Sequence, residues 1–347
     1  MAHPAPSPAR LPLLDGLRGF AALAVLFHHE PGVYGSHGLL GRAYLAVDFF
    51  FMLSGFVLAL AFDDRFRRGL DPDSFIVARL GRLWPVLALG VLIGGAAHLW
   101  AGEGSVVIWL TLFSLALVPV ARGEWAIYQL NGPQWSLTFE VLANYAHATL
   151  LWRLSNRALL GLTLACGAVL AWCGLGWGSL GVGDVAANWW GGFARIGFGY
   201  GMGLWLARRW RAGTGRPPAW AAWSGAMILP VTLTTGAFWP GSWVEVDMAC
   251  VFLLFPISLW CAAHVSLRGG IVGWASALGA VSYPVYALHV PLLWWGGKIA
   301  RLHPEHQSAI RLGTLALIIA LSVAVARSPL ARGWRPGKSL ALRPSAG

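Results

Sequence analysis

The sequence has few charged side chains and few cysteines. Asp, Glu, Lys and Arg make up 11% of its 347 residues, whereas soluble proteins carry about 25% charged residues. Hydrophobic residues make up 57%, and they occur in continuous runs of roughly 18 or more, long enough to cross a bilayer as helices. This pattern argues against a soluble globular protein. It also argues against an outer-membrane barrel, because the runs do not alternate with polar residues.

The four cysteines all lie inside apolar runs and include no CxxC pair. They are Cys166, Cys173, Cys250 and Cys261. Clustered cysteines are the usual sign of a zinc site or a disulfide framework, so this pattern indicates packing residues and predicts no metal site. The first 12 residues are polar and Pro-rich and contain no small-residue cleavage site, so no removable signal peptide is predicted.

Hydropathy predicts eleven apolar segments between polar connections. They are 13–30, 44–62, 83–101, 106–121, 135–152, 158–174, 192–207, 218–235, 243–265, 273–297 and 309–326. Basic residues cluster in the connections 63–82 and 208–216 and in the tail from Arg327. Cytoplasmic connections are enriched in Lys and Arg, and these clusters share one face only if 106–121 does not cross. We therefore expect ten spans with both termini cytoplasmic and 106–121 re-entrant or interfacial, with eleven spans as the alternative.

These expectations define an all-α, multi-pass membrane protein. It has a short cytoplasmic segment at 1–12, a transmembrane domain at 13–326 and a basic cytoplasmic tail at 327–347. The net charge of +11 then marks the cytoplasmic face, and no nucleic-acid partner is expected because the basic residues do not follow one polar face. The basic residues expected on the outer side are Arg42, Arg122, Lys298, Arg301 and Arg311.

Arg18 and His29 are the first functional candidates, because a charge at the centre of a span costs roughly 2.5–3.5 kcal/mol. Arg18 lies near the cytoplasmic start of the first segment, and His28 and His29 lie near its outer end. Eleven helical residues turn about 1,100°, within ~20° of three full turns, and rise about 16 Å. Arg18 and His29 therefore share a helix face, whereas His28 lies ~80° away. Alternatively, Arg18 snorkels to lipid headgroups and His29 sits in the opposite interface.

Two carboxylates are predicted at the depth of His29. Asp48 lies near the outer end of the second segment, with Ser54 six residues deeper, and Glu140 lies in QWSLTFEVLANY. A carboxylate beside an imidazole orients the ring and stabilises its protonated form, as a general base requires. We therefore expect Asp48 or Glu140 to support His29. Ser54 by itself also fits close packing between helices.

A basic motif lies on the cytoplasmic side. Arg79 and Arg82 stand three residues apart in FIVARLGRLWPV, at the depth expected for Arg18. Three guanidinium groups there would form a phosphate site open to the cytoplasm. An ordinary basic flank is the alternative.

A late segment, SYPVYALHVPLLWW, is broken by Pro284 and Pro291. Prolines in a span free backbone carbonyls that protein or water must satisfy, and this favours a site here over plain packing. The polar side chains of this segment are Ser282, Tyr283, Tyr286 and His289.

Five pieces of the sequence resemble the acyltransferase 3 family, a group of membrane O-acetyltransferases that modify bacterial polysaccharides and some antibiotics. They are LDGLRGFAALAVLFHH, AVDFFFMLSGF, ARLGRLWP, NGPQWSLTFE and SYPVYALHVP, in the family's order and spread over nearly the whole chain. The resemblance matches Arg18 and His29 to the family's signature pair, and His28 to a position that is often Tyr. It matches Arg79 and Arg82 to the family's RxxR motif.

The family's WSLxxE motif corresponds to Trp135, Ser136 and Glu140. The resemblance implies a bacterial inner-membrane enzyme that transfers an acyl group, usually acetyl, from cytoplasmic acetyl-CoA to a hydroxyl of a glycan or glycolipid. It implies no permanently bound cofactor, and polysaccharide-synthesis proteins are possible partners. Many relatives carry an additional extracytoplasmic hydrolase-like domain, which we do not expect in this chain.

The helix geometry and the resemblance together suggest a mechanism. Arg18, Arg79 and Arg82 would hold the CoA phosphates, and the pantetheine arm would cover the ~16 Å to His29. His29 would deprotonate the acceptor hydroxyl, or would itself be acylated first. The developing oxyanion needs a donor. Candidate substrate or oxyanion contacts are Ser54, Ser136, Tyr283, His289 and a backbone amide near Pro284.

Two other functions compete with acyl transfer. A glycolipid or polysaccharide transporter or flippase would also be multi-pass and have broken helices. A receptor that has lost catalysis is a third interpretation. The absence of a detectable internal repeat disfavours a transporter, and the intact Arg18 and His29 pair disfavours a receptor.

Overall fold

The computed structural model describes residues 11–30, 38–121 and 125–332, and these residues form helices and short connections without a named strand. The predicted terminal segments 1–12 and 327–347 lie mostly outside the described residues. The helices are α1 (Pro12–His28), η1 (Ala43–Leu45), α3 (Ala46–Arg67), α4 (Pro72–Trp100), α5 (Val106–Leu115), α6 (Gln134–Thr149), η2 (Leu151–Arg153), α7 (Asn156–Trp177), α8 (Gly191–Arg211), α9 (Ala219–Ala226), α10 (Ile228–Thr235), η3 (Gly236–Phe238), α11 (Trp243–Met248), η4 (Ala249–Leu254), α12 (Phe255–Ala262), α13 (Gly270–Leu302), η5 (Pro304–His306), α14 (Gln307–Arg327) and α15 (Pro329–Arg332).

Seven helical stretches of the described residues are long and apolar enough to cross a membrane. They are Ala43–Arg67, Pro72–Trp100, Asn156–Trp177, Ala219–Phe238, Trp243–Ala262, Gly270–Leu302 and Pro304–Arg327. Helices α1 and α6, which carry Arg18 and Glu140, are shorter, with 17 and 16 residues. The protein is therefore a multi-pass helical membrane protein, and the count of ten spans with cytoplasmic termini stays a prediction.

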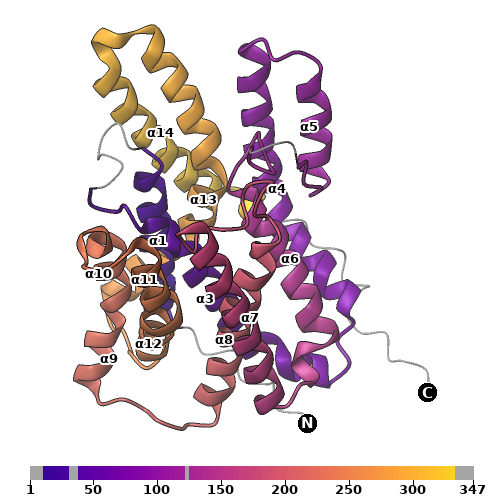
Figure 1. Ribbon diagram of the computed structural model, residues 1–347, viewed down its shortest axis with the longest axis vertical. Helices are drawn as coiled ribbons and strands as arrows, with labels where there is room; N and C mark the ends of the chain where they lie inside the picture. Colours follow the sequence, from indigo (N-terminus) through magenta and orange to yellow (C-terminus); the bar gives the residue numbers. More distant parts are fainter. Residues whose placement is uncertain (1–10, 31–37, 122–124, 333–347) are drawn as a thin grey trace.

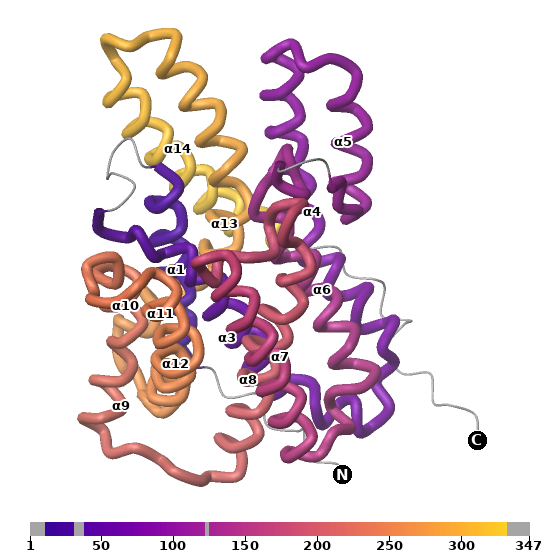
Figure 2. The backbone as a smooth tube through the Cα atoms, in the orientation of Figure 1, coloured from indigo at the N-terminus to yellow at the C-terminus, as the bar shows by residue number. Residues whose placement is uncertain are grey.

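Helix α5 is too short to cross a bilayer by itself. Its ten residues extend about 15 Å, half of the ~30 Å hydrocarbon core. The tube in Figure 2 shows that it folds back beside the end of α4. The re-entrant or interfacial position of 106–121 stays a prediction.

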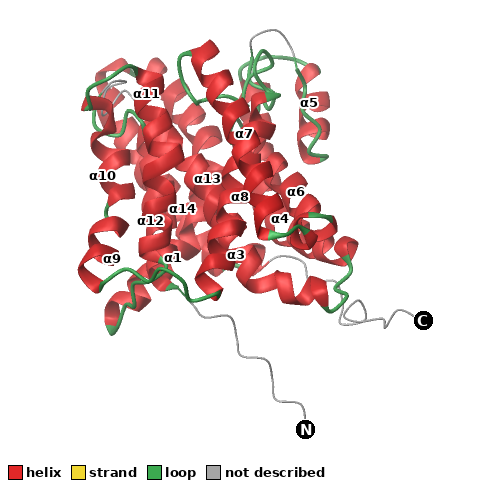
Figure 3. Cartoon of the chain, turned by 60° about the horizontal axis from the view of Figure 1, so that its bottom comes forward, coloured by secondary structure: helices red, strands yellow, loops and turns green. Residues whose placement is uncertain are grey.

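The connections gather at the two ends of the helix bundle (Figure 3). The α3–α4 turn and the α8–α9 connection lie at the lower end in Figure 1, opposite the α4–α5 and α13–α14 turns. The basic connections 63–82 and 208–216 thus share one end of the molecule, as the predicted topology requires.

Close backbone contacts hold the helices that carry the site. A Cβ at Gly203 of α8 would collide with the carbonyl oxygen of Met52 in α3. A Cβ at Gly19 of α1 would likewise collide with Leu278 of α13. Glycines at such crossings let backbones approach more closely than larger side chains would. They fix α1 against α13 and α3 against α8.

Candidate functional site

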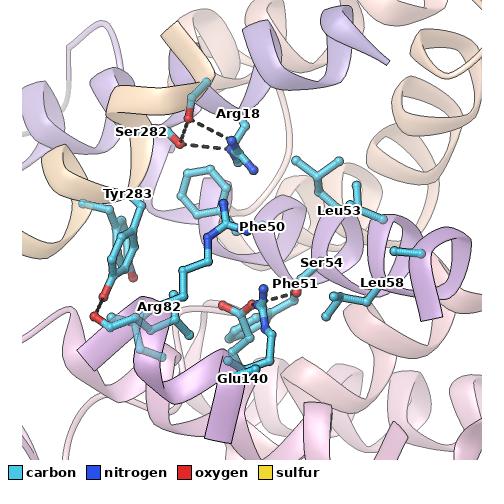
Figure 4. A pocket seen from close by; sticks show the side chains of 18 of the residues that line it. Arg18, Phe50, Phe51, Leu53, Ser54, Leu58, Arg82, Glu140, Ser282 and Tyr283 are labelled. Atoms are coloured by element: carbon cyan, nitrogen blue, oxygen red, sulfur yellow. Dashed lines mark hydrogen bonds and ion pairs between the residues drawn. The ribbon is translucent and has the colours of Figure 1, made fainter. Parts of the chain in front are cut away.

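A cavity of about 910 Å³ opens among α1, α3, α4, α6 and α13. Its charged lining residues are Arg18, Arg65, Arg79, Arg82 and Glu140. Four cations and one anion leave a formal surplus of three positive charges. Figure 4 shows that Arg18, Arg82 and Glu140 reach the same space from different helices. The structure thus brings together the three arginines that the sequence predicts to form one site.

Arg18 points into the protein. Its Nη2 donates to the carbonyl oxygen of Gly279 at 2.8 Å, and its Nε donates to Oγ of Ser282 at 3.0 Å. Asp15, one turn earlier on α1, lies 3.3 Å from its guanidinium. These contacts attach Arg18 to α13 at the cavity wall (Figure 4), which does not fit the alternative of snorkelling to lipid headgroups.

Glu140 also belongs to the arginine cavity. Its Oε1 accepts from Nη2 of Arg79 at 2.9 Å and from the Ser54 hydroxyl at 2.7 Å (Figure 4 shows the Ser54 contact). The Arg79 and Glu140 side chains are 16% and 17% exposed. Three helices, α3, α4 and α6, therefore meet at one carboxylate. Glu140 has no hydrogen bond or ion pair with His29 among the described residues, so its predicted support of His29 is not what the structure shows.

Arg82 lines the same cavity and has no hydrogen bond or ion pair with any described residue. The neighbouring Nε of Arg79 is buried and also lacks a partner there. A buried donor without a partner costs about 1–3 kcal/mol, and a bound anion would remove that cost. The cavity therefore has guanidinium capacity that the protein's own carboxylates do not use.

Polar side chains of α6 and α13 also line this cavity. Tyr283 donates its hydroxyl proton to the carbonyl oxygen of Leu83 in α4. Ser136 donates to the carbonyl oxygen of Pro133 at 3.0 Å and lies 2.7 Å from the hydroxyl of Tyr286. Ser54 and Tyr283 thus already donate their hydroxyl protons to strong acceptors. The hydroxyl of Tyr286 is held only by another hydroxyl.

His29 lines a second cavity, of about 280 Å³. Its other lining residues are Glu30, Val290, Leu293, Trp294, Gly297 and Arg311. Nδ1 of His29 lies 2.9 Å from the carbonyl oxygen of Val25. A carbonyl only accepts hydrogen bonds, so Nδ1 carries the proton and Nε2 keeps its lone pair. His28 bonds to the carbonyl oxygen of Leu40 and lines neither cavity. The predicted difference in activity between the two histidines stays a prediction.

Asp48 likewise has no hydrogen bond or ion pair with His29 among the described residues. Both of its oxygens accept hydrogen bonds at 2.8 Å from Arg195 of α8, and both side chains are almost fully buried. A buried pair of this kind ties α3 to α8, and removing one partner would leave an unpaired charge. The predicted role of Asp48 in supporting His29 is therefore corrected to a structural one. The sequence contained one sign of this pair, because Arg195 is a charged residue within the apolar segment 192–207.

The neighbour of His29 is another histidine. The ring centres of His29 and His289 lie 5.0 Å apart, and His289 is fully buried. The ring of Tyr286, which lines the arginine cavity, lies 5.7 Å from that of His289. Tyr286, His289 and His29 thus form a row of contacting rings that runs from the arginine cavity to the second cavity.

The sequence interpretation did not select two charged residues of the second cavity. Glu30 is 6% exposed. Its Oε1 accepts a hydrogen bond of 2.6 Å from Nη1 of Arg311 in α14, and the two side chains form an ion pair. Arg311 was predicted to lie on the outer side, and Glu30 directly follows His29 in the sequence. That adjacency was the available signal. Groups of three or more His, Cys, Asp or Glu that could hold a metal do not occur in the described part of the chain.

The fold and the site define a multi-pass helical membrane protein in which one helix, α1, contributes to a basic cavity and to a smaller histidine-lined cavity. A family model described as an acyltransferase domain matches residues 11–327. The chain belongs to this acyltransferase 3 family.

Three curated relatives match shorter stretches. Protein 2 in picA locus of Rhizobium radiobacter is 42% identical over 90 residues, which cover 26% of this chain and 46% of that protein. The putative peptidoglycan O-acetyltransferase YrhL of Bacillus subtilis is 31% identical over 116 residues, 33% of this chain and 16% of the relative. O-acetyltransferase OatA of Staphylococcus aureus is 37% identical over 83 residues, which cover 23% of this chain and 13% of that protein. This chain thus covers less than half the length of each of these relatives. No solved structure matches it.

Proposed function

We propose that this protein is a membrane O-acyltransferase that moves an acyl group, most simply acetyl, from acyl-CoA to a hydroxyl of a glycan or glycolipid. The observation that carries the proposal is the cavity that joins Arg18, Arg79 and Arg82. Family membership and the O-acetyltransferase names of two relatives support the reaction type. We place the protein in a bacterial inner membrane, where polysaccharide-synthesis proteins would supply the acceptor.

The donor fits the arginine cavity by charge and position. CoA carries several phosphate charges, and guanidinium groups bind phosphate oxygens through paired hydrogen bonds. Arg82 and Nε of Arg79 are free to form such bonds. Arg65 lies in the last turn of α3, and the α3–α4 turn lies at the end of the bundle that carries the basic connections (Figure 1). The donor would therefore enter from the cytoplasm in the predicted topology.

The acceptor fits the second cavity. Nε2 of His29 is the nitrogen that can accept a proton there, because Nδ1 is already bound to Val25. The two cavities lie at opposite ends of one helix face, and ~16 Å of helix rise separates Arg18 from His29. An extended pantetheine arm that enters beside Arg18 would bring its thioester toward Tyr286 and His29.

The reaction can be written with its atoms in balance. The O–H bond of the acceptor breaks, and its proton goes to Nε2 of His29 as the oxygen bonds to the thioester carbon. The carbon–sulfur bond then breaks, and the leaving sulfur takes the proton to give free CoA thiol. An alternative order acylates His29 first and then transfers the group to the acceptor. Trapping a labelled acetyl-protein without acceptor would separate the two orders.

The best-placed donor to the developing oxyanion is the hydroxyl of Tyr286. Turning that hydroxyl toward a thioester costs only its contact with Ser136, which keeps its own bond to Pro133. Ser54 would instead have to leave the carboxylate of Glu140. Hydrogen bonds to charged groups are stronger than those between neutral groups, so Ser54 is the costlier choice.

Incubating the purified protein with acetyl-CoA and a mixture of glycans, and measuring free CoA thiol, tests the proposal. We expect thiol release that depends on both substrates and disappears in His29→Ala. A transporter or flippase would release no thiol above the level of the His29→Ala control. That result would overturn the proposed function.

A further inference from the structure

His289 is held in the same way as His29. Its Nδ1 lies 2.7 Å from the carbonyl oxygen of Tyr286 and 3.2 Å from that of Val285. Both partners only accept, so Nδ1 carries the proton and Nε2 carries a lone pair. This Nε2 is buried and has no hydrogen-bond partner in the described part of the chain. Buried polar atoms are nearly always paired, so an unpaired acceptor beside a proposed catalytic histidine calls for an explanation.

The two rings are close enough to share a proton where their Nε2 atoms face each other. Their centres lie 5.0 Å apart. An N–H···N bond of ~2.9 Å between two imidazoles places the ring centres about 5 Å apart. Nε2 of His289 has no hydrogen-bond partner among the described residues, and two neutral imidazoles that both carry their protons on Nδ1 cannot form such a bond. A single added proton would let Nε2 of His29 donate to Nε2 of His289.

We propose that His289 is the positioning residue of the reaction: it accepts a hydrogen bond from Nε2 of His29 once His29 has taken the proton of the acceptor hydroxyl. This inference rests on the proposed function. It gives a second imidazole the role that the sequence analysis assigned to a carboxylate.

The other charged or titratable groups around the pair do not take this role. His28 bonds to Leu40, and Glu30 is bound by Arg311 of α14. Tyr286 carries a hydroxyl group and precedes His289 by about one turn of α13. The proton therefore passes from the acceptor hydroxyl to His29, is shared with His289, and leaves with the sulfur of CoA. No oxidant, reductant or further reactant is needed.

Two substitutions separate this role from a purely structural one. His289→Gln places an amide oxygen near the position of Nε2, whereas His289→Asn places its amide nearer to Nδ1 and keeps the bond to Tyr286. We expect His289→Gln to retain kcat within about tenfold and His289→Asn to lose about a hundredfold, since general-base effects are typically 10²–10⁴. The KM for acetyl-CoA should not change in either variant. The reverse order of activities would overturn the proposal.

A spectroscopic measurement tests the pair without any acceptor. The full chain, labelled with ¹⁵N in its imidazoles and placed in lipid nanodiscs, is titrated with acid. We expect a scalar coupling between the two Nε2 nuclei in the singly protonated state, and its loss in His289→Asn. His264 is a matched internal control, since its Nδ1 also bonds to the carbonyl four residues earlier, and it should show no coupling.

The two tests fail independently. Titration of the two rings without any coupling would overturn the role of His289, whatever the activity. Coupling in a protein that releases no CoA thiol would instead overturn the proposed function and leave the imidazole pair established.

Discussion

The two cavities differ in how their charges are arranged. In the arginine cavity, four guanidinium groups face one carboxylate, and two of the arginines keep unused donors. In the histidine cavity the only ion pair, within the described residues, joins Glu30 to Arg311. Nδ1 of His29 bonds to the carbonyl oxygen of Val25, and the ring of His289 lies beside that of His29. The first cavity is therefore suited to holding an anion, and the second to moving a proton.

Replacing His29 should have the largest effect. His29→Ala removes the free Nε2, and we expect transfer to fall by at least about a thousandfold, within the range of general-base effects. His28→Ala should keep substantial activity, because His28 lines neither cavity. Thiol release by the two variants at equal protein concentration checks this. Equal losses in both would remove the distinction between the histidines.

Breaking the Asp48 and Arg195 pair should affect stability rather than transfer. Asp48→Asn leaves a buried guanidinium without its counter-charge, which typically costs about 3–5 kcal/mol. Thermal unfolding in detergent measures the loss. The double variant Asp48→Leu with Arg195→Met is the control, and it should recover most of the stability. If Asp48→Asn folds normally but does not transfer, Asp48 belongs to the histidine site after all.

Loss of one cavity arginine should affect the donor. We expect Arg18→Ala and Arg82→Ala each to raise the KM for acetyl-CoA about tenfold, which corresponds to a loss of ~1.4 kcal/mol of binding free energy. The KM for the acceptor should change less. Arg68→Ala is the matched control, because Arg68 is exposed near the same end of the bundle and does not line the cavity. Kinetics in which the acceptor KM rises more than the donor KM would move these arginines out of the donor site.

The smallest effect is expected at the rim of the histidine cavity. Glu30→Gln removes the charge that faces Arg311, whose side chain is 23% exposed, and we expect the acceptor KM to change a few-fold because solvent screens the Arg311 side of the pair. The KM for acetyl-CoA should stay constant. Initial rates over a range of both substrates give the two constants, and a change confined to the donor would contradict the assignment of this cavity to the acceptor.

The sequence predicted the arginine cavity better than the histidine cavity. Arg18, Arg79 and Arg82 each lie in the first half of a helix that begins at the basic end of the molecule, so the charge distribution indicates that they lie at a similar depth. The all-helical fold and the short segment at 106–121 followed from hydropathy in the same way. Charge distribution and hydropathy are properties of each segment by itself, so they can be evaluated from the sequence.

The partners of buried charges depend on which helices touch, and hydropathy does not contain that information. Asp48 pairs with Arg195 across the glycine-lined contact of α3 and α8, and Glu140 turns toward Arg79. Both carboxylates were therefore assigned to the wrong partner. His289 was selected only as a general candidate, because its closeness to His29 follows from the packing of α1 on α13.

Binding of acetyl-CoA to variants in lipid nanodiscs tests the division of roles between the two cavities most directly. Isothermal titration would compare wild type, Arg18→Ala and His29→Ala. We expect His29→Ala to bind acetyl-CoA as tightly as wild type while failing to release thiol, and Arg18→Ala to bind about tenfold more weakly. Normal binding by Arg18→Ala together with weakened binding by His29→Ala would contradict the assignment of the donor to the arginine cavity.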